Sequence, residues 1–102
     1  MKPLFILALS AASLLGGCKS TSDMPPPATV QMAETGHVDL VQLRQGRGLF
    51  ASRCIECHAL PSVAQHTAAE WPRLIDEMAT RANLKPAERG AVVAYIVAVR
   101  QQ

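Results

Sequence analysis

A single short run, Cys54-Ile55-Glu56-Cys57-His58, carries more chemistry than any other part of the sequence. Its pattern is C-x-x-C-H, in which two thiols lie three residues apart and a histidine follows at once. Two thiols at this spacing on a tight turn can each bond one vinyl group of a porphyrin, and the next residue then lies under the iron. We therefore predict a c-type haem, with Cys54 and Cys57 as thioether anchors and His58 as the proximal iron ligand.

Two other uses of paired cysteines fit this sequence less well. A thioredoxin-like redox pair belongs in a βαβ pattern, and no such pattern surrounds Cys54. A zinc site needs a second pair of ligands at regular spacing, and His37 and His66 are too isolated to supply one. His37 precedes the first helical pattern, where we expect an exposed side chain.

The chain is short, and its composition suits a protein built around a cofactor. A length of 102 residues predicts one small domain, which buries a thin core and usually needs a staple. A covalently bound haem is such a staple, because its flat apolar faces become the centre of the core. Only 4% of the residues are aromatic, which agrees with this view. The formal net charge is +2 without a basic stripe of interleaved aromatic residues, so nothing indicates a nucleic-acid partner.

Residues 1–17 have the composition of a secretory signal peptide. Lys2 gives a positive start, and the apolar stretch after it is too short to span a membrane comfortably. The end of this segment, Leu14 to Cys18, resembles a bacterial lipobox. In that family the signal is removed before the cysteine, which then carries the lipid, so the resemblance implies lipidation of Cys18. The alternative is an ordinary signal peptide with an incidental cysteine.

The lipobox resemblance implies a lipid-anchored protein on the periplasmic side of a bacterial membrane. By resemblance to enterobacterial sorting rules, Lys19 favours the outer membrane. Over residues 18–36 we predict a Pro-rich tether, because a polar stretch that leads into three prolines cannot bury a core and stays extended. Met24 and Met32 are then linker residues, and residues 37–102 form the folded domain.

The first helix is predicted over residues 39–52. Residues on one helix face recur there at spacings of three and four: Leu40, Leu43, Gly46 and Phe50. Asp39 is a suitable N-cap. Because glycine costs about 1 kcal/mol inside a helix, Gly46 indicates a close crossing with another helix. Gly48 has no such explanation.

The segment Gly46-Arg47-Gly48-Leu49-Phe50, shortly before the C-x-x-C-H motif, resembles the N-terminal helix of class I cytochromes c. In that family a glycine and an aromatic residue of this helix pack against an aromatic residue of the last helix, and the matching residue here is Tyr95. The resemblance covers about residues 38–100. It implies an all-α, small cytochrome c-like fold with about three helices packed around one covalently bound haem.

Two further helices are predicted after the motif. Thr67 to Glu70 matches a capping box, and apolar residues follow on one helix face: Trp71, Leu74, Ile75 and Met78. After a break at residues 83–86, the last helix is expected to begin near Pro86. Its apolar run, residues 91–99, would also suit a buried strand, but the proline, the length and the haem motif favour a helix.

The residue opposite His58 across the iron decides whether the site is closed or open. We predict Met78, because class I cytochromes c place the distal methionine between the haem motif and the last helix. Its spacing of seven residues from Trp71 also resembles a pattern in small cytochromes and in the haem subunit of quinohaemoprotein amine dehydrogenases. The alternatives are that Met78 fills core space and that His66 is the ligand. Trp71 is expected to pack on the haem or its edge, or else in plain core.

Together these features predict an electron carrier and not an enzyme. No residue is assigned a catalytic role, since the carboxylates after the motif fit solvated helix faces or caps: Glu70, Asp76, Glu77 and Glu88. The predicted function is a membrane-tethered monohaem cytochrome that passes single electrons between redox proteins. An open distal site would instead make a haem-based sensor of small ligands. A third reading is a haem subunit of a larger oxidoreductase, which docks through an exposed side of the last helix at Val93 and Val97.

Overall fold

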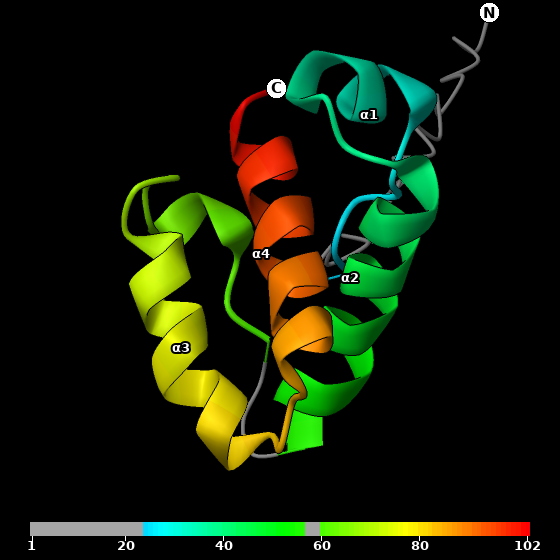
Figure 1. Cartoon of the computed structure of the whole chain (residues 1–102). Coiled ribbons are helices and arrows are strands. Elements are labelled where there is room, and N and C mark those ends of the chain that lie inside the picture. The colour runs from blue at the N-terminus through cyan, green and yellow to red at the C-terminus, as the bar shows by residue number, and fades with distance from the viewer. Residues whose placement is uncertain (1–23, 57–59) are drawn as a thin grey trace, which may run out of the picture.

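Every regular element in the described part of the chain, residues 24–56 and 60–102, is helical. In this part the computed structural model has four α-helices and two short 3₁₀ turns (Figure 1). The helices are α1 Val30–Gly36, α2 Leu40–Arg53, α3 Trp71–Arg81 and α4 Pro86–Arg100, and the turns are η1 Cys54–Glu56 and η2 Val63–Gln65. The predicted all-α class is confirmed, as is a helix over residues 91–99.

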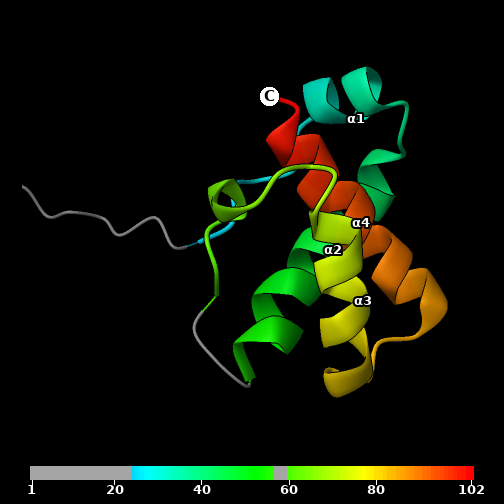
Figure 2. The same cartoon turned by 90° about the vertical axis from the view of Figure 1, so that its left-hand side faces the viewer.

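Helix α4 lies between α2 and α3 and runs in the opposite direction to both (Figures 1 and 2). The largest fully buried side chains come from these three helices: Leu43, Phe50, Trp71, Ile75, Val92, Tyr95 and Ile96. Val93 and Val97 were expected on an exposed side of α4. Both are half-buried instead, because α4 has helices on two sides.

Helix α2 begins where the sequence predicts, at Leu40 after the N-cap Asp39. The Asp39 carboxylate accepts a hydrogen bond from the backbone N–H of Val41 at 3.2 Å, which satisfies one of the free amides at the helix start. The helix ends at Arg53, and the backbone tightens there into the 3₁₀ turn that starts with Cys54. The start of the predicted haem motif is therefore fixed to the end of a 14-residue helix.

Gly46 allows α2 and α4 to cross at close range. A Cβ atom added to it would lie 2.0 Å from the carbonyl oxygen of Ala91 and 2.9 Å from the Cβ of Tyr95. These distances are shorter than any ordinary contact, so only glycine fits this position. The predicted contact of Gly46 with Tyr95 on the last helix is confirmed. A Cβ atom at Gly48 would meet nothing within 4 Å, so packing gives no reason for this second glycine.

Helix α3 is preceded by the predicted capping box. The Thr67 hydroxyl accepts from the Glu70 N–H at 3.2 Å, and the Glu70 carboxylate accepts from the Thr67 N–H at 2.8 Å. Pro72 lies in the first turn, where its missing N–H costs no helical hydrogen bond. At the other end of the bundle, Pro86 opens α4 as predicted, and the Glu88 carboxylate accepts from the Lys85 N–H at 2.9 Å.

The segment before Gly36 takes part in the core, and in this respect the prediction of an extended tether is wrong for residues 25–36. Pro25 is buried, and Thr29 caps α1 by accepting from the Met32 N–H at 3.1 Å. Met32, expected to be a linker residue, is only 7% exposed within the main cluster. The reason is that the seven-residue helix α1 packs against α2 and α4 (Figure 1), and Met32 is its buried residue.

The predicted signal peptide, residues 1–17, and the first residues of the tether lie outside the described residues, so their boundaries stay predictions. The same holds for the lipidation of Cys18. Among the helices of residues 24–56 and 60–102, none combines the length and the apolar character that a membrane crossing requires.

Candidate haem site

Of the two predicted haem anchors, Cys54 and Cys57, the structure describes Cys54. It is 6% exposed and belongs to the main apolar cluster, one turn after Phe50. Its neighbour Ile55 points outward, with 55% of its surface exposed. Cys57 and His58 lie outside the described residues. The tight turn on which both thiols are expected thus begins at the edge of the core.

The end of α2 that leads into Cys54 lies beside the end of α3 that carries Met78. The Arg53 guanidinium reaches the Ala82 carbonyl at 3.5 Å, and the Ala82 N–H donates to the Met78 carbonyl at 2.8 Å. One helical turn therefore separates Met78 from the residue that α2 contacts. The other candidate, His66, meets Trp71, whose ring in turn meets Phe50 one turn before Cys54, so the choice of Met78 as ligand stays a prediction.

Met78 occupies a boundary position on α3. The centre of the buried face is formed by Trp71, Ile75 and Ala79, at spacings of four. Met78 and Leu74 lie to one side of this line, half-buried against the main cluster. Ile75, in the line itself, is 1% exposed. Because Leu74 is half-buried in the same way as Met78, this burial fits both a ligand and a residue that fills core space.

His66 lies at the opposite end of α3. Its ring meets the Trp71 ring edge-on, with centroids 5.2 Å apart, and its Nδ1 is 3.9 Å from a Glu70 carboxylate oxygen. The His66 side chain is 41% exposed. Seven residues of helix, about 10 Å along the axis, separate Trp71 from Met78. His66 and Met78 therefore belong to different ends of the site.

Trp71 connects three parts of the structure. Its indole N–H donates to the Val63 carbonyl at 2.9 Å, and its ring meets the Phe50 ring edge-on at 6.3 Å. The side chain is completely buried. Trp71 thus ties the loop after the haem motif to both α2 and α3, which is a core position. A contact between Trp71 and a haem stays a prediction.

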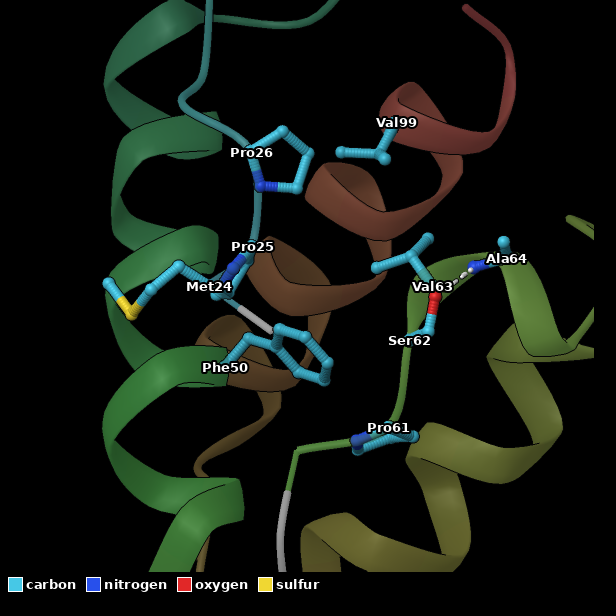
Figure 3. A pocket seen from close by; sticks show the side chains of 9 residues that line it. All are labelled: Met24, Pro25, Pro26, Phe50, Pro61, Ser62, Val63, Ala64 and Val99. Atoms are coloured by element: carbon cyan, nitrogen blue, oxygen red, sulfur yellow. Dashed lines mark hydrogen bonds between the residues drawn. The ribbon is translucent and has the colours of Figure 1, made fainter. Parts of the chain in front are cut away.

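An apolar hollow of about 210 Å³ lies between the N-terminal segment and the loop after the motif. Figure 3 shows Phe50 of α2 and Val63 of η2 pointing toward it. The complete lining is Met24, Pro25, Pro26, Phe50, Pro61, Ser62, Val63, Ala64 and Val99.

Two groups have a shifted pKa. The backbone N–H of Thr67, followed by its hydroxyl contact, lowers the pKa of Glu70 below its usual value of 4.5. Burial raises the pKa of Tyr95 to about 12, against the opposing effect of the nearby Arg47 charge. Neither group is a predicted iron ligand. Both groups make structural contacts, Glu70 in the capping box before α3 and Tyr95 between α4 and the proline segment.

The residues present fit a covalently bound haem. Two thiols at this spacing can bond the porphyrin vinyl groups, and an imidazole and a methionine sulfur are ligands typical of haem iron. Partly buried apolar side chains belong to each element that borders the motif: Leu49, Leu60, Leu74 and Met78. In residues 24–56 and 60–102 no three His, Cys, Asp or Glu side chains form a metal-binding group.

Sequence reasoning did not identify the partners of Trp71, although Phe50 and Val63 are apolar residues close to the motif. It also missed the contacts of the proline segment, which pair residues far apart in the chain. Comparisons of the chain with protein-family models, with curated proteins and with solved structures gave no match.

Proposed function

We propose that this protein is a membrane-tethered monohaem c-type cytochrome that carries single electrons between redox proteins in the periplasm. One structural observation is the main support for this proposal. The C-x-x-C-H motif starts at the end of α2, and the contact between Arg53 and Ala82 brings the Met78 end of α3 next to it. The motif that contains the predicted proximal histidine thus begins where α2 ends, the predicted distal methionine lies on α3, and both helices pack on α4.

The role that we propose for each residue follows from its chemistry. Haem c supplies one-electron chemistry when bound. Cys54 and Cys57 would hold it covalently, and His58 and Met78 would bind its iron. Methionine sulfur is a soft ligand that favours ferrous iron and raises the reduction potential. The close α2–α4 crossing at Gly46 holds α2, which leads into the motif, against the core, and a rigid site needs little rearrangement during electron transfer.

The described carboxylates after the motif agree with a carrier role. Each is occupied by a structural contact at the surface: Glu70 with Thr67, Asp76 with Arg89, Glu77 with Arg73, and Glu88 with Lys85. Electron-transfer partners would meet the haem edge through a small, transient interface. We place the protein on the periplasmic side of a bacterial membrane through the lipid on Cys18, with the outer membrane favoured.

Covalent haem attachment tests the proposal. The full chain is produced with a haem-maturation system, denatured, and examined by mass spectrometry and by its haem absorption. We expect the wild type to keep one haem after denaturation and the Cys54→Ala and Cys57→Ala variants to lose one thioether bond each. Ile55→Ala, between the two thiols, is the matched control and should keep both bonds. A wild-type chain without covalent haem would overturn the proposal.

A further inference from the structure

The proline segment is held by side chains from two helices. The Nε of Arg47, on α2, donates to the carbonyls of Pro25 at 3.0 Å and Pro26 at 3.1 Å. The hydroxyl of Tyr95, on α4, donates to the same Pro26 carbonyl. Proline has a fixed φ and no N–H, so this stretch can form backbone hydrogen bonds only through its carbonyl oxygens. Both donors lie at the α2–α4 crossing, next to Gly46.

Helix α1 extends this attachment. Met32 inserts into the main cluster, and Val38 donates its N–H to the Ala33 carbonyl at 3.0 Å, which closes the chain back toward α2. Residues 25–36 are therefore part of the folded body. The chain joins that body at Met24, which is 65% exposed.

Met24 lines the same hollow as the loop that follows the haem motif. It lines the apolar hollow together with Pro61 and Phe50, and Figure 3 shows it on the Phe50 side of that hollow. Figure 3 shows Pro25 and Pro26 facing Val63 across the same hollow. The point from which the domain is tethered thus lies on the side of residues 61–64.

The segment between Cys18 and Met24, called the leash below, is short. Six residues lead from Cys18 to Met24, and a fully extended chain of that length reaches at most about 20 Å. A free tether that ended at Gly36 would reach about 60 Å. We propose that Arg47 and Tyr95 clasp the proline segment so that the side of residues 61–64 is held close to the bilayer. The bilayer part of this proposal depends on the proposed lipid at Cys18, and the arrangement fits a redox partner in the same membrane.

The clasp, meaning the hydrogen bonds from Arg47 and Tyr95 to the proline carbonyls, is tested by an experiment that measures neither haem nor lipid. The full chain is compared with the double variant Arg47→Gln/Tyr95→Phe, which keeps both side chains similar in size but removes the charge and the hydroxyl. Hydrogen exchange of the α1 amides should become at least tenfold faster in the double variant and stay unchanged in α3. Arg44→Gln, an exposed residue of the same helix, is the matched control. Unchanged exchange in α1 would overturn the clasp.

The distance to the membrane is measured by neutron reflectometry of the lipid-modified chain on a supported bilayer. The double variant keeps Met32, so it frees the chain only up to Thr29, before α1. For flexible chains, the mean leash length grows from about 13 Å for six residues to about 18 Å for eleven, and we expect the double variant to lie about 5 Å farther from the head groups than the wild type. Equal distances would overturn the bilayer part. A chain that does not bind would overturn the lipid anchor and the bilayer part together, while hydrogen exchange still decides the clasp.

Discussion

At Gly46 the absence of a side chain sets the separation of α2 and α4. Replacement by alanine would push a Cβ atom to within 2.0 Å of a backbone oxygen, which no rotamer change can relieve. We expect Gly46→Ala to destabilise the protein by about 1–3 kcal/mol, as overpacking of a core does. Denaturant unfolding followed by far-ultraviolet circular dichroism measures this change.

The control for this prediction is two residues away on the same helix. Gly48→Ala adds a Cβ atom into open space, so it should stabilise α2 by up to about 1 kcal/mol through helix propensity. Equal unfolding midpoints for the two alanine variants would contradict the close crossing.

Because of Tyr95, we expect the free energy of unfolding to fall as the pH rises in the alkaline range. Burial favours its neutral form and raises its pKa to about 12, above the ordinary value of 10.0. Its contribution is therefore complete below pH 10.0 and is lost as the pH rises toward 12. Urea unfolding across this window should show a steeper loss of stability for the wild type than for Tyr95→Phe. Parallel losses would contradict the burial of an ionisable hydroxyl.

At the scale of single elements, the capping box fixes where α3 starts. Thr67→Ala removes the hydroxyl that accepts from the Glu70 N–H and should cost about 1 kcal/mol. Thr80→Ala, at an exposed position of the same helix, is the control and should change stability less. Thermal unfolding of the two variants beside the wild type measures the difference, and equal losses would show that the box contributes nothing.

The same capping box predicts an acid effect with a defined sign. The pKa of Glu70 is lowered below 4.5, chiefly by the Thr67 N–H, so its carboxylate stabilises the native state above that pH. This contribution falls as the pH drops from 4.5 through the lowered value. Glu70→Gln should remove part of the wild type's acid sensitivity in unfolding experiments between pH 5 and pH 2. An unchanged pH profile would contradict the assignment.

Helices α2, α3 and α4 could be predicted from the sequence because their signals are local. Asp39, the Thr67–Glu70 box and Pro86 mark the helix starts, and the apolar spacing of each helix lies within the element itself. Helix α1 could not be predicted in this way. It has seven residues, and its stability depends on Met32 reaching a core formed by distant residues.

At the scale of the whole molecule, the candidate site divides into a predictable part and a part that needs the fold. The motif Cys54 to His58 is recognisable from spacing alone. The choice between Met78 and His66 is different, because both lie on the same stretch after the motif. The packing of α3 places Ala82, one turn after Met78, against Arg53 and places His66 against Trp71, and the choice between the two ligands stays a prediction.

The coordination of the iron tests the central claim most directly. Ferric and ferrous spectra are recorded for the haem-loaded wild type, Met78→Ala and His66→Ala. We predict a low-spin wild type with the far-red band of methionine–iron bonding, lost in Met78→Ala and kept in His66→Ala. A high-spin wild type that binds carbon monoxide readily, or a band lost only in His66→Ala, would contradict the account.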